Sequence, residues 1–518
     1  MPDLAKRNVL FIVADNWRGE CLGILGHPSL RTPNLDRLAK AGTTFTRHYT
    51  QASPSGPARA SLYTGLYLFN HRSVNNGTPL DARHTTLALE ARAKGYDPTL
   101  FGYTSTSVDP RTVNPNDPRL QDYEGILPGF RPGVAGKWEP WLVYLRGKDF
   151  PGPLTPDGTA QQQKNYPGAK ERGTTYAPTL YRAEDSETAF LCDRALEWLP
   201  LQNENNWFLH LSIKKPHGPW VAPEPYNALY DPDSVPAVRR AASAAAEARQ
   251  HSYLAWMIEN HRRANYLSLL GGREADTPIE EIRQARAVYF GLMTEVDHHI
   301  GRIIDFLERT GQYDNTLVIF TSDHGEYLGD HHLMAKNGYF DQAFHVPLIV
   351  RDPDKTADGL RGKRVDAFTE AVDLMPTILE WIGNDVPPQC DGESLLPFLH
   401  DGKAPGWRTE AHWEFDFREV RERAAAKALG LMPDQCSLAV IRGERYKYVH
   451  FTALPPLFFD LESDPDELDN RSGDPACRTQ ELEYARKMLS WRMNHADRTL
   501  ANMHVGKGGL FEWRGRRR

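Results

Sequence analysis

The sequence has few cysteines. There are five in 518 residues, and they show no CxxC or other metal-binding spacing: Cys21, Cys192, Cys390, Cys436 and Cys477. Such scattered cysteines give no sign of a disulfide framework or of a cysteine-based zinc site. A reducing cytoplasm is the compartment that this pattern predicts.

Long apolar runs are also missing. No stretch is long enough to span a bilayer. The N-terminal residues Met-Pro-Asp-Leu-Ala-Lys-Arg lead directly into a strand-like run, without the apolar core and small-residue cleavage site of a secretory signal. We therefore expect neither secretion nor a membrane partner.

There is no excess of positive charge. The net charge is -7 and the isoelectric point is near 6.3, so nucleic-acid binding is not expected. Residues 507–518 are basic, which is typical of a solvated or subunit-bound tail. Hydrophobic residues at 40% and charged residues at 25% are ordinary for a globular protein.

The chain alternates between strand-like and helix-like segments. Asn8–Ala14 is continuously apolar, as in a strand that is buried on both faces. Further strands are expected at 98–103, 207–213, 317–321 and 346–351, and helices at 32–38, 282–307 and 373–382. This alternation predicts an α/β fold with a large, mainly parallel sheet flanked by helices.

Two other regions interrupt this pattern. Residues 232–277 are rich in Ala and Arg and predict a helical insertion, near the site or at a subunit contact. Beyond about residue 400, alternating strands at 446–451 and 457–461 and a helix at 479–495 predict a smaller antiparallel sheet. We expect a catalytic domain at 1–400 and a C-terminal α+β subdomain with a tail at 401–518.

Polar residues follow four of the predicted strands. They are Asp15-Asn16, Tyr103-Thr104-Ser105, Lys214 to His217, and Asp323-His324. Ligands in parallel sheets bind at the carboxyl ends of the strands. These residues are therefore expected to meet at one edge of the sheet.

The most specific motif is Ser55-Gly-Pro-Ala-Arg59, followed by Thr64-Gly65. Taken alone, it also fits a turn that leads into a helix. It resembles the sulfatase signature, in which the first residue is oxidised to formylglycine and attacks as a hydrated aldehyde. The resemblance implies that Ser55 is the nucleophile and that Arg59 holds it and offsets its negative charge.

A second segment, Thr321 to His331, resembles the metal-binding segment of the same family. The resemblance implies that Asp15, Ser55, Asp323 and His324 hold one divalent ion. Oxygen ligands beside one imidazole favour manganese, with calcium and magnesium left open. Glu326, His331 and His332 are expected at most to support these ligands.

The likeness covers nearly the whole chain and is greatest to phosphonate monoester hydrolases, which also hydrolyse phosphodiesters. Asn16 stands where ordinary sulfatases have a second Asp, and Gly56 fits the phosphonate branch. Gly102 to Ser105 replaces the Gly-Lys-Trp-His of typical sulfatases, and Pro455 to Asp460 resembles the C-terminal region of that branch. The implied fold is that of alkaline phosphatase.

The resemblance also implies a set of substrate contacts. Tyr103, Ser105 and Asn76 would offer neutral donors to the substrate, which tolerate an oxygen that carries a substituent. His217 would act as general acid or bind the anion, and Lys336 would offset charge on the transferred group. The alternatives are an ordinary strand-end aromatic at Tyr103 and a satisfied loop histidine at His217.

Serine at position 55 departs from the usual cysteine. It fits a cysteine exchanged for serine, a serine oxidised by the anaerobic route of a formylglycine-generating maturation enzyme, or a serine that attacks directly. The leading hypothesis is hydrolysis of phosphonate monoesters and phosphodiesters, with sulfate esters as further substrates. An arylsulfatase and a silent anion-binding homologue are the alternatives, and the resemblance implies a homodimer or homotetramer.

Overall fold

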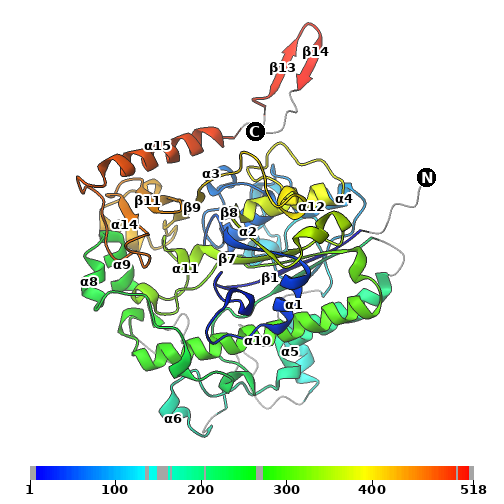
Figure 1. The fold of residues 1–518 in the computed structure, drawn as a ribbon, viewed down its shortest axis with the longest axis horizontal. Coiled ribbons are helices and arrows are strands. Elements are labelled where there is room, and N and C mark those ends of the chain that lie inside the picture. The colour runs from blue at the N-terminus through cyan, green and yellow to red at the C-terminus, as the bar shows by residue number, and fades with distance from the viewer. Residues whose placement is uncertain are drawn as a thin grey trace.

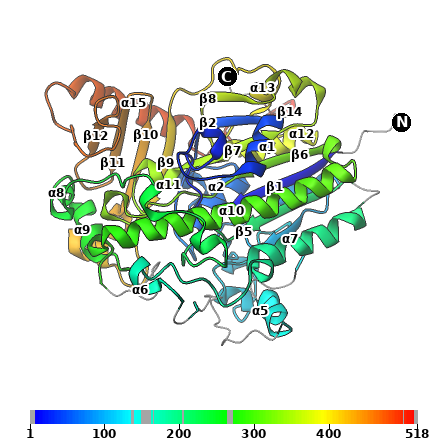
Figure 2. The same ribbon diagram turned by 60° about the horizontal axis from the view of Figure 1, so that its bottom comes forward.

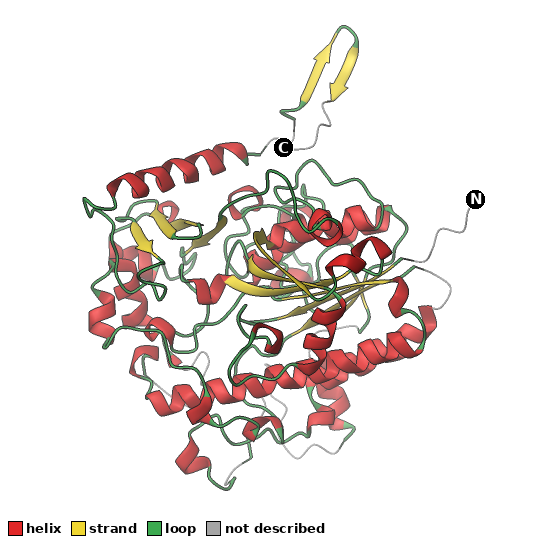
Figure 3. Cartoon of the chain, viewed as in Figure 1, coloured by secondary structure: helices red, strands yellow, loops and turns green. Residues whose placement is uncertain are grey.

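The computed structural model describes residues 7–134, 139–148, 162–163, 166–202, 206–263, 272–497 and 500–512. Residues 264–271 of the predicted insertion and 513–518 of the basic tail lie outside this part. The described residues form a large central sheet with helices on both of its faces and a smaller sheet to one side (Figures 1 and 3).

The central sheet has eight strands in the order β4-β3-β5-β1-β6-β7-β2-β8. Their bounds are β1 Asn8–Ala14, β2 Thr43–Tyr49, β3 Thr99–Gly102, β4 Arg131–Pro132, β5 Phe208–Ile213, β6 Thr316–Thr321, β7 His345–Arg351 and β8 Lys363–Glu370. All neighbours pair in parallel except β7, which is antiparallel to both β6 and β2. The predicted mainly parallel α/β sheet is confirmed, with this one reversed strand.

The two faces of β1 build two separate cores, because successive side chains of a strand point to opposite faces. Leu10 and Ile12 pack with α1, α7 and α10, whereas Val9 and Phe11 pack with α2, α4 and α12. The helix bounds are α1 Pro33–Ala41, α2 Ser55–Thr64, α4 Leu87–Ala93, α7 Glu187–Trp198, α10 Ile279–Arg309 and α12 Leu374–Trp381. Figure 2 shows α7 and α10 lying side by side beneath the sheet.

The C-terminal part forms an antiparallel sheet in the order β12-β11-β10-β9, as the sequence predicts. The bounds are β9 Ala411–Asp416, β10 Ser437–Arg442, β11 Tyr446–Phe451, β12 Leu457–Asp460 and α15 Arg478–Asn494. After α15, a hairpin of β13 (Met503–Gly506) and β14 (Gly509–Glu512) projects away from the body (Figure 1).

The described part of the 232–277 segment packs against the loop that follows β6. Its helices are α8 (Ala244–Ala248) and α9 (Ser252–Asn260), and Glu247 of α8 lies 2.6 Å from Nδ1 of His331. Met257 shares a buried cluster with Tyr327 and Tyr339 of that loop. The segment therefore lies next to the predicted metal-binding segment. In the described part of the chain, no helix is long and apolar enough to cross a membrane.

Candidate metal centre and nucleophile site

Adjacent strands deliver the site residues to one edge of the sheet. Asp15 directly follows β1, Tyr103 follows β3, His217 lies beyond β5, and Asp323 and His324 follow β6. Because β3, β5, β1 and β6 are consecutive in the sheet and parallel, their carboxyl ends meet. Ser55 is the first residue of α2, which presents it to the same edge.

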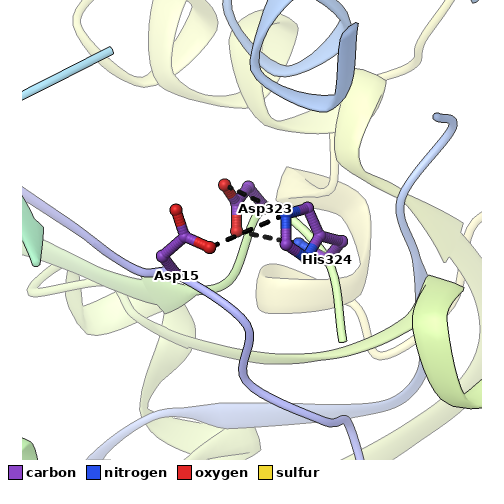
Figure 4. A group of neighbouring side chains, drawn as sticks. All are labelled: Asp15, Asp323 and His324. Carbon is purple, nitrogen blue, oxygen red and sulfur yellow. Dashed lines mark hydrogen bonds and ion pairs between the residues drawn. The ribbon is translucent and has the colours of Figure 1, made fainter. Parts of the chain in front are cut away.

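Asp15, Asp323 and His324 form a buried group whose ligand atoms all lie within 4.8 Å of one another (Figure 4). Oδ1 of Asp15 is buried and has no hydrogen-bond partner among the described residues. Nδ1 of His324 contacts the carbonyl oxygen of Gly325 at 3.0 Å, which leaves Nε2 directed at the carboxylates. An orphaned carboxylate oxygen beside an imidazole nitrogen that faces the carboxylates fits a divalent cation.

The surroundings keep these ligands in their metal-binding states. Burial would raise the pKa of Asp15, but His217, His324, Lys336 and Arg59 together hold it well below its ordinary value. Burial lowers the pKa of His324. Asp15 is thus ionised and His324 neutral near pH 7, as coordination requires.

The hydroxyl of Ser55 lies inside this group. Its Oγ is 2.9 Å from Nε2 of His324 and 3.5 Å from Oδ2 of Asp15. The backbone N–H of Gly56 donates to Oδ1 of Asn76 at 2.8 Å. A Cβ at Gly56 would lie only 3.0 Å from that oxygen, so glycine is what admits Asn76 beside the nucleophile.

Arg59 is fully buried and ties the ligands together. Its Nε donates to Asp323 at 2.8 Å, and Nη2 lies 3.4 Å from Oδ2 of Asp15. Nη1 donates to Oγ of Ser212 at 2.7 Å and to the carbonyl oxygen of Tyr103 at 3.0 Å. Arg59 therefore offsets the two carboxylates and lies one helical turn from Ser55.

The predicted neutral donors lie close by. The hydroxyl of Tyr103 donates to Oδ2 of Asp15, and its ring covers the guanidinium of Arg59 at 4.4 Å. Ser105 has a φ of 50°, and its carbonyl oxygen packs 3.5 Å from the Cβ position of Gly56. Both residues therefore flank the nucleophile, with the Tyr103 hydroxyl directed at the metal ligands in this structure.

His217 and Lys336 complete the set. Burial, and then the nearby charge of Lys336, lower the pKa of His217 to about 3, against the opposing effect of Asp15. Lys336 is buried, and its Nζ donates to Oδ1 of Asn16 at 3.1 Å. The structure thus brings all ten predicted residues to one region: Asp15, Ser55, Arg59, Asn76, Tyr103, Ser105, His217, Asp323, His324 and Lys336.

Sequence reasoning missed one polar contact of this site. Ser212 interrupts the apolar strand β5, and that interruption is the signal that could have found it. Asn16 was expected at this edge of the sheet, but its partners were not predicted. It lies in the left-handed region with φ 67°, which asparagine tolerates better than most residues, and it bonds to Lys336 and Glu326.

The fold and the site define a class: an α/β enzyme with a group of carboxylate and imidazole side chains of the metal-ligand type at the strand ends. The family model described as Sulfatase matches residues 7–384, and that of N-sulphoglucosamine sulphohydrolase, C-terminal, matches 329–494. The chain belongs to the sulfatase family of the alkaline phosphatase superfamily. This confirms the predicted resemblance and the predicted class, a hydrolase that acts on ester bonds.

Three relatives are similar to this chain over nearly its whole length. The multifunctional alkaline phosphatase superfamily protein PehA of Trinickia caryophylli is 46% identical and covers 98% of this chain and 99% of its own. The phosphonate monoester hydrolase of Agrobacterium radiobacter has a TM-score of 0.93 at 44% identity, over 98% of this chain and 100% of its own. Phosphonate monoester hydrolase SpPMH from Silicibacter pomeroyi has a TM-score of 0.91 at 40% identity, over 98% and 99%.

Proposed function

We propose that this protein hydrolyses phosphonate monoesters and phosphodiesters at position 55. The observation that carries the proposal is the place of the Ser55 hydroxyl, 2.9 Å from His324 and 3.5 Å from Asp15 within the metal-ligand group. A nucleophile at this point can attack an anion that the cation and Arg59 draw in. The names of the two related phosphonate monoester hydrolases support the phosphonate part of this proposal.

Asp15, Asp323, His324 and position 55 would hold one divalent ion. The ion would supply positive charge at the nucleophile and at the transferred group. Manganese is the proposed metal because an imidazole joins the oxygen ligands. Activity of metal-stripped protein reloaded with manganese, calcium or magnesium tests this choice, and highest turnover with calcium or magnesium would contradict it.

Neutral donors favour substrates with a substituted oxygen. Asn76, Ser105 and Tyr103 would contact the non-reacting oxygens, and Lys336 would offset the charge that builds up on the transferred group. No lysine–histidine pair stands at residues 102–105, where typical sulfatases have one. This difference favours a phosphonate monoester or a phosphodiester, in which an organic group takes the place of one free oxygen of a sulfate ester.

The test is a comparison of three esters that share one aryl leaving group: a phosphonate monoester, a phosphodiester and a sulfate. We expect kcat/KM to be highest for one of the two phosphorus esters. A large preference for the sulfate would instead identify an arylsulfatase, the alternative that the matching Sulfatase model favours. Tight anion binding without turnover of any ester would identify a silent homologue.

We propose that Ser55 carries the formylglycine modification, made by a maturation enzyme of the anaerobic type. An unmodified serine would form an ester intermediate whose breakdown needs a positioned water, whereas a hydrated aldehyde releases its product by collapse. Mass spectrometry of the tryptic peptide 48–59 tests this, since oxidation removes two hydrogen atoms. If the serine is unmodified, a Ser55→Cys variant made in an aerobic host is expected to recover activity.

We also propose a cytoplasmic homodimer or homotetramer. In the part of the chain that the structure describes, none of the five cysteines forms a disulfide, which fits a reducing compartment. Val505, Leu510 and Phe511 of the projecting hairpin are 81%, 64% and 63% exposed, and a two-stranded hairpin is marginal alone. Light scattering of the full chain and of a chain ending at residue 499 tests the oligomer. A monomeric full chain would contradict it.

A further inference from the structure

Glu326 lies behind the candidate site and touches none of the metal-ligand group. It is fully buried two residues after His324, in the loop between β6 and β7. Its Oε2 accepts a hydrogen bond from Nδ2 of Asn16 at 2.6 Å. Its Oε1 accepts from the backbone N–H of Leu328 at 3.2 Å and also from that of Ala335.

The same amide of Asn16 reaches the site on its other side. Its Oδ1 accepts from Nζ of Lys336 at 3.1 Å, and Asn16 itself has no exposed surface. The two contacts require one orientation of the amide: the ammonium group of Lys336 only donates and so faces Oδ1, and Nδ2 then donates to Glu326. Asn16 therefore links Glu326 to Lys336 through a chain of donors and acceptors.

The backbone around this chain is held in an uncommon conformation. Leu328, His331, His332 and Ala335 all have positive φ, between 48° and 68°. Non-glycine residues reach this region at a cost and stay there only when their surroundings hold them. Through Leu328 and Ala335, Glu326 holds both ends of this stretch, and Lys336 follows directly after it.

We infer that Glu326 is a positioning residue that sets the place of the Lys336 ammonium by orienting the amide of Asn16. The inference rests on the proposed function, because it assigns Lys336 to the transferred group. It adds that the lysine is useful only while the amide of Asn16 keeps its oxygen toward it. Glu326 acts through Asn16 and does not itself contact the substrate.

The test is the exchange Glu326→Gln, which keeps the shape and offers only one acceptor oxygen. If that oxygen keeps its bonds from Leu328 and Ala335, the new NH2 group points at the NH2 group of Asn16. The side-chain amide of Asn16 would then flip, and its NH2 group would point at the ammonium of Lys336, which also only donates. We expect kcat/KM to fall at least about tenfold, because mutating a residue that holds a site residue from outside commonly lowers activity about 10–100-fold. Glu326→Asp, which keeps both acceptor oxygens, is expected to recover part of the loss.

Glu274→Gln is the matched control. Glu274 is also buried and accepts from the backbone of the same loop, at Met334 N 2.9 Å away, but it has no bond to Asn16. A role limited to holding the loop would make Glu274→Gln as damaging as Glu326→Gln. We expect less than a threefold effect for the control, with thermal unfolding of both variants measured alongside.

A double-mutant cycle decides whether the effect passes through the lysine. In a Lys336→Met background, Glu326→Gln is expected to add less than threefold, and full additivity would overturn the inference. Binding of inorganic phosphate, measured by calorimetry in all four proteins, gives a readout without turnover. If the wild type binds phosphate but hydrolyses no ester, the proposed function fails while the coupling in phosphate affinity still tests Glu326.

Discussion

Nδ1 of His217 lies 2.6 Å from the carbonyl oxygen of Gly218. A carbonyl oxygen only accepts, so Nδ1 carries the proton of the neutral ring and Nε2 has the free lone pair. With its pKa lowered to about 3, His217 is neutral in the ligand-free protein near pH 7. It can therefore donate from Nε2 only after an anionic substrate has raised its proton affinity.

Replacing His217 with glutamine separates its two predicted roles. Glutamine can donate a hydrogen bond to the bound anion but cannot give up a proton. If His217 is the general acid, we expect kcat to fall by about 100-fold or more for esters with alkyl leaving groups. For an aryl leaving group such as nitrophenol the loss is expected to be much smaller. An equal loss for both kinds of ester would show that His217 only binds the anion.

Arg59→Met is expected to destabilise the fold as well as abolish turnover. Removing one partner of a buried ion pair typically costs about 3–5 kcal/mol, because the carboxylates of Asp15 and Asp323 remain buried. The loss of unfolding free energy in urea is expected to be larger without metal than with saturating manganese, since the cation offsets the same carboxylates. Equal losses with and without manganese would contradict the idea that Arg59 and the cation offset the same two carboxylates.

Metal affinity is expected to depend little on pH in the mildly acidic range. An imidazole with an ordinary pKa near 6.5 would lose about tenfold in affinity between pH 7.5 and 5.5. Burial lowers the pKa of His324, and the pKa of Asp15 is also low, so protonation of these two ligands is expected to cost less affinity than that. Competition with a chelating dye should show a change smaller than tenfold, and a full tenfold drop would count against this arrangement.

Glu295 on α10 predicts a pH effect on stability. Burial raises its pKa to about 7 from an ordinary 4.5. A raised folded-state pKa gives stability that is complete below pH 4.5 and is lost as the pH rises to about 7, by about 3 kcal/mol in all. Glu295→Gln should therefore gain about this much relative to the wild type between pH 4 and pH 8, measured by urea unfolding.

The control for this shift is Glu308→Gln, at a partly exposed position on the same helix. Its stability relative to the wild type should change far less over the same pH range. A shift of similar size in both variants would point to the helix as a whole and away from the buried carboxyl of Glu295.

The sequence predicted the fold well where strands are buried on both faces. Asn8–Ala14 is apolar from its second residue onward and was recognised with its bounds. Thr43–Tyr49 and Lys363–Glu370 pair at the edge of the sheet and carry many polar residues, so neither strand was predicted. The reversed direction of β7 leaves no trace in its composition, because side-chain burial is the same for either direction.

The resemblance to the sulfatase family implied Ser55 as the nucleophile and Asp15, Asp323 and His324 as metal ligands. The structure brings these four side chains together. Glu326 was expected only to support the site, because its partners come from 310 and 9 residues away in the sequence. Such hydrogen-bond partners depend on loop conformation, which no short motif records.

The burial of α2 has a consequence for the order of events in making the enzyme. All ten residues of this helix are buried, and Ser55 itself is only 6% exposed. A modifying enzyme cannot seat an extended peptide in its own active site while that peptide is locked inside a finished fold. The proposed oxidation of Ser55 would therefore have to come before folding. Molecules that fold first would keep an unmodified serine. The rate of oxidation relative to the rate of folding would then set the active fraction of a preparation.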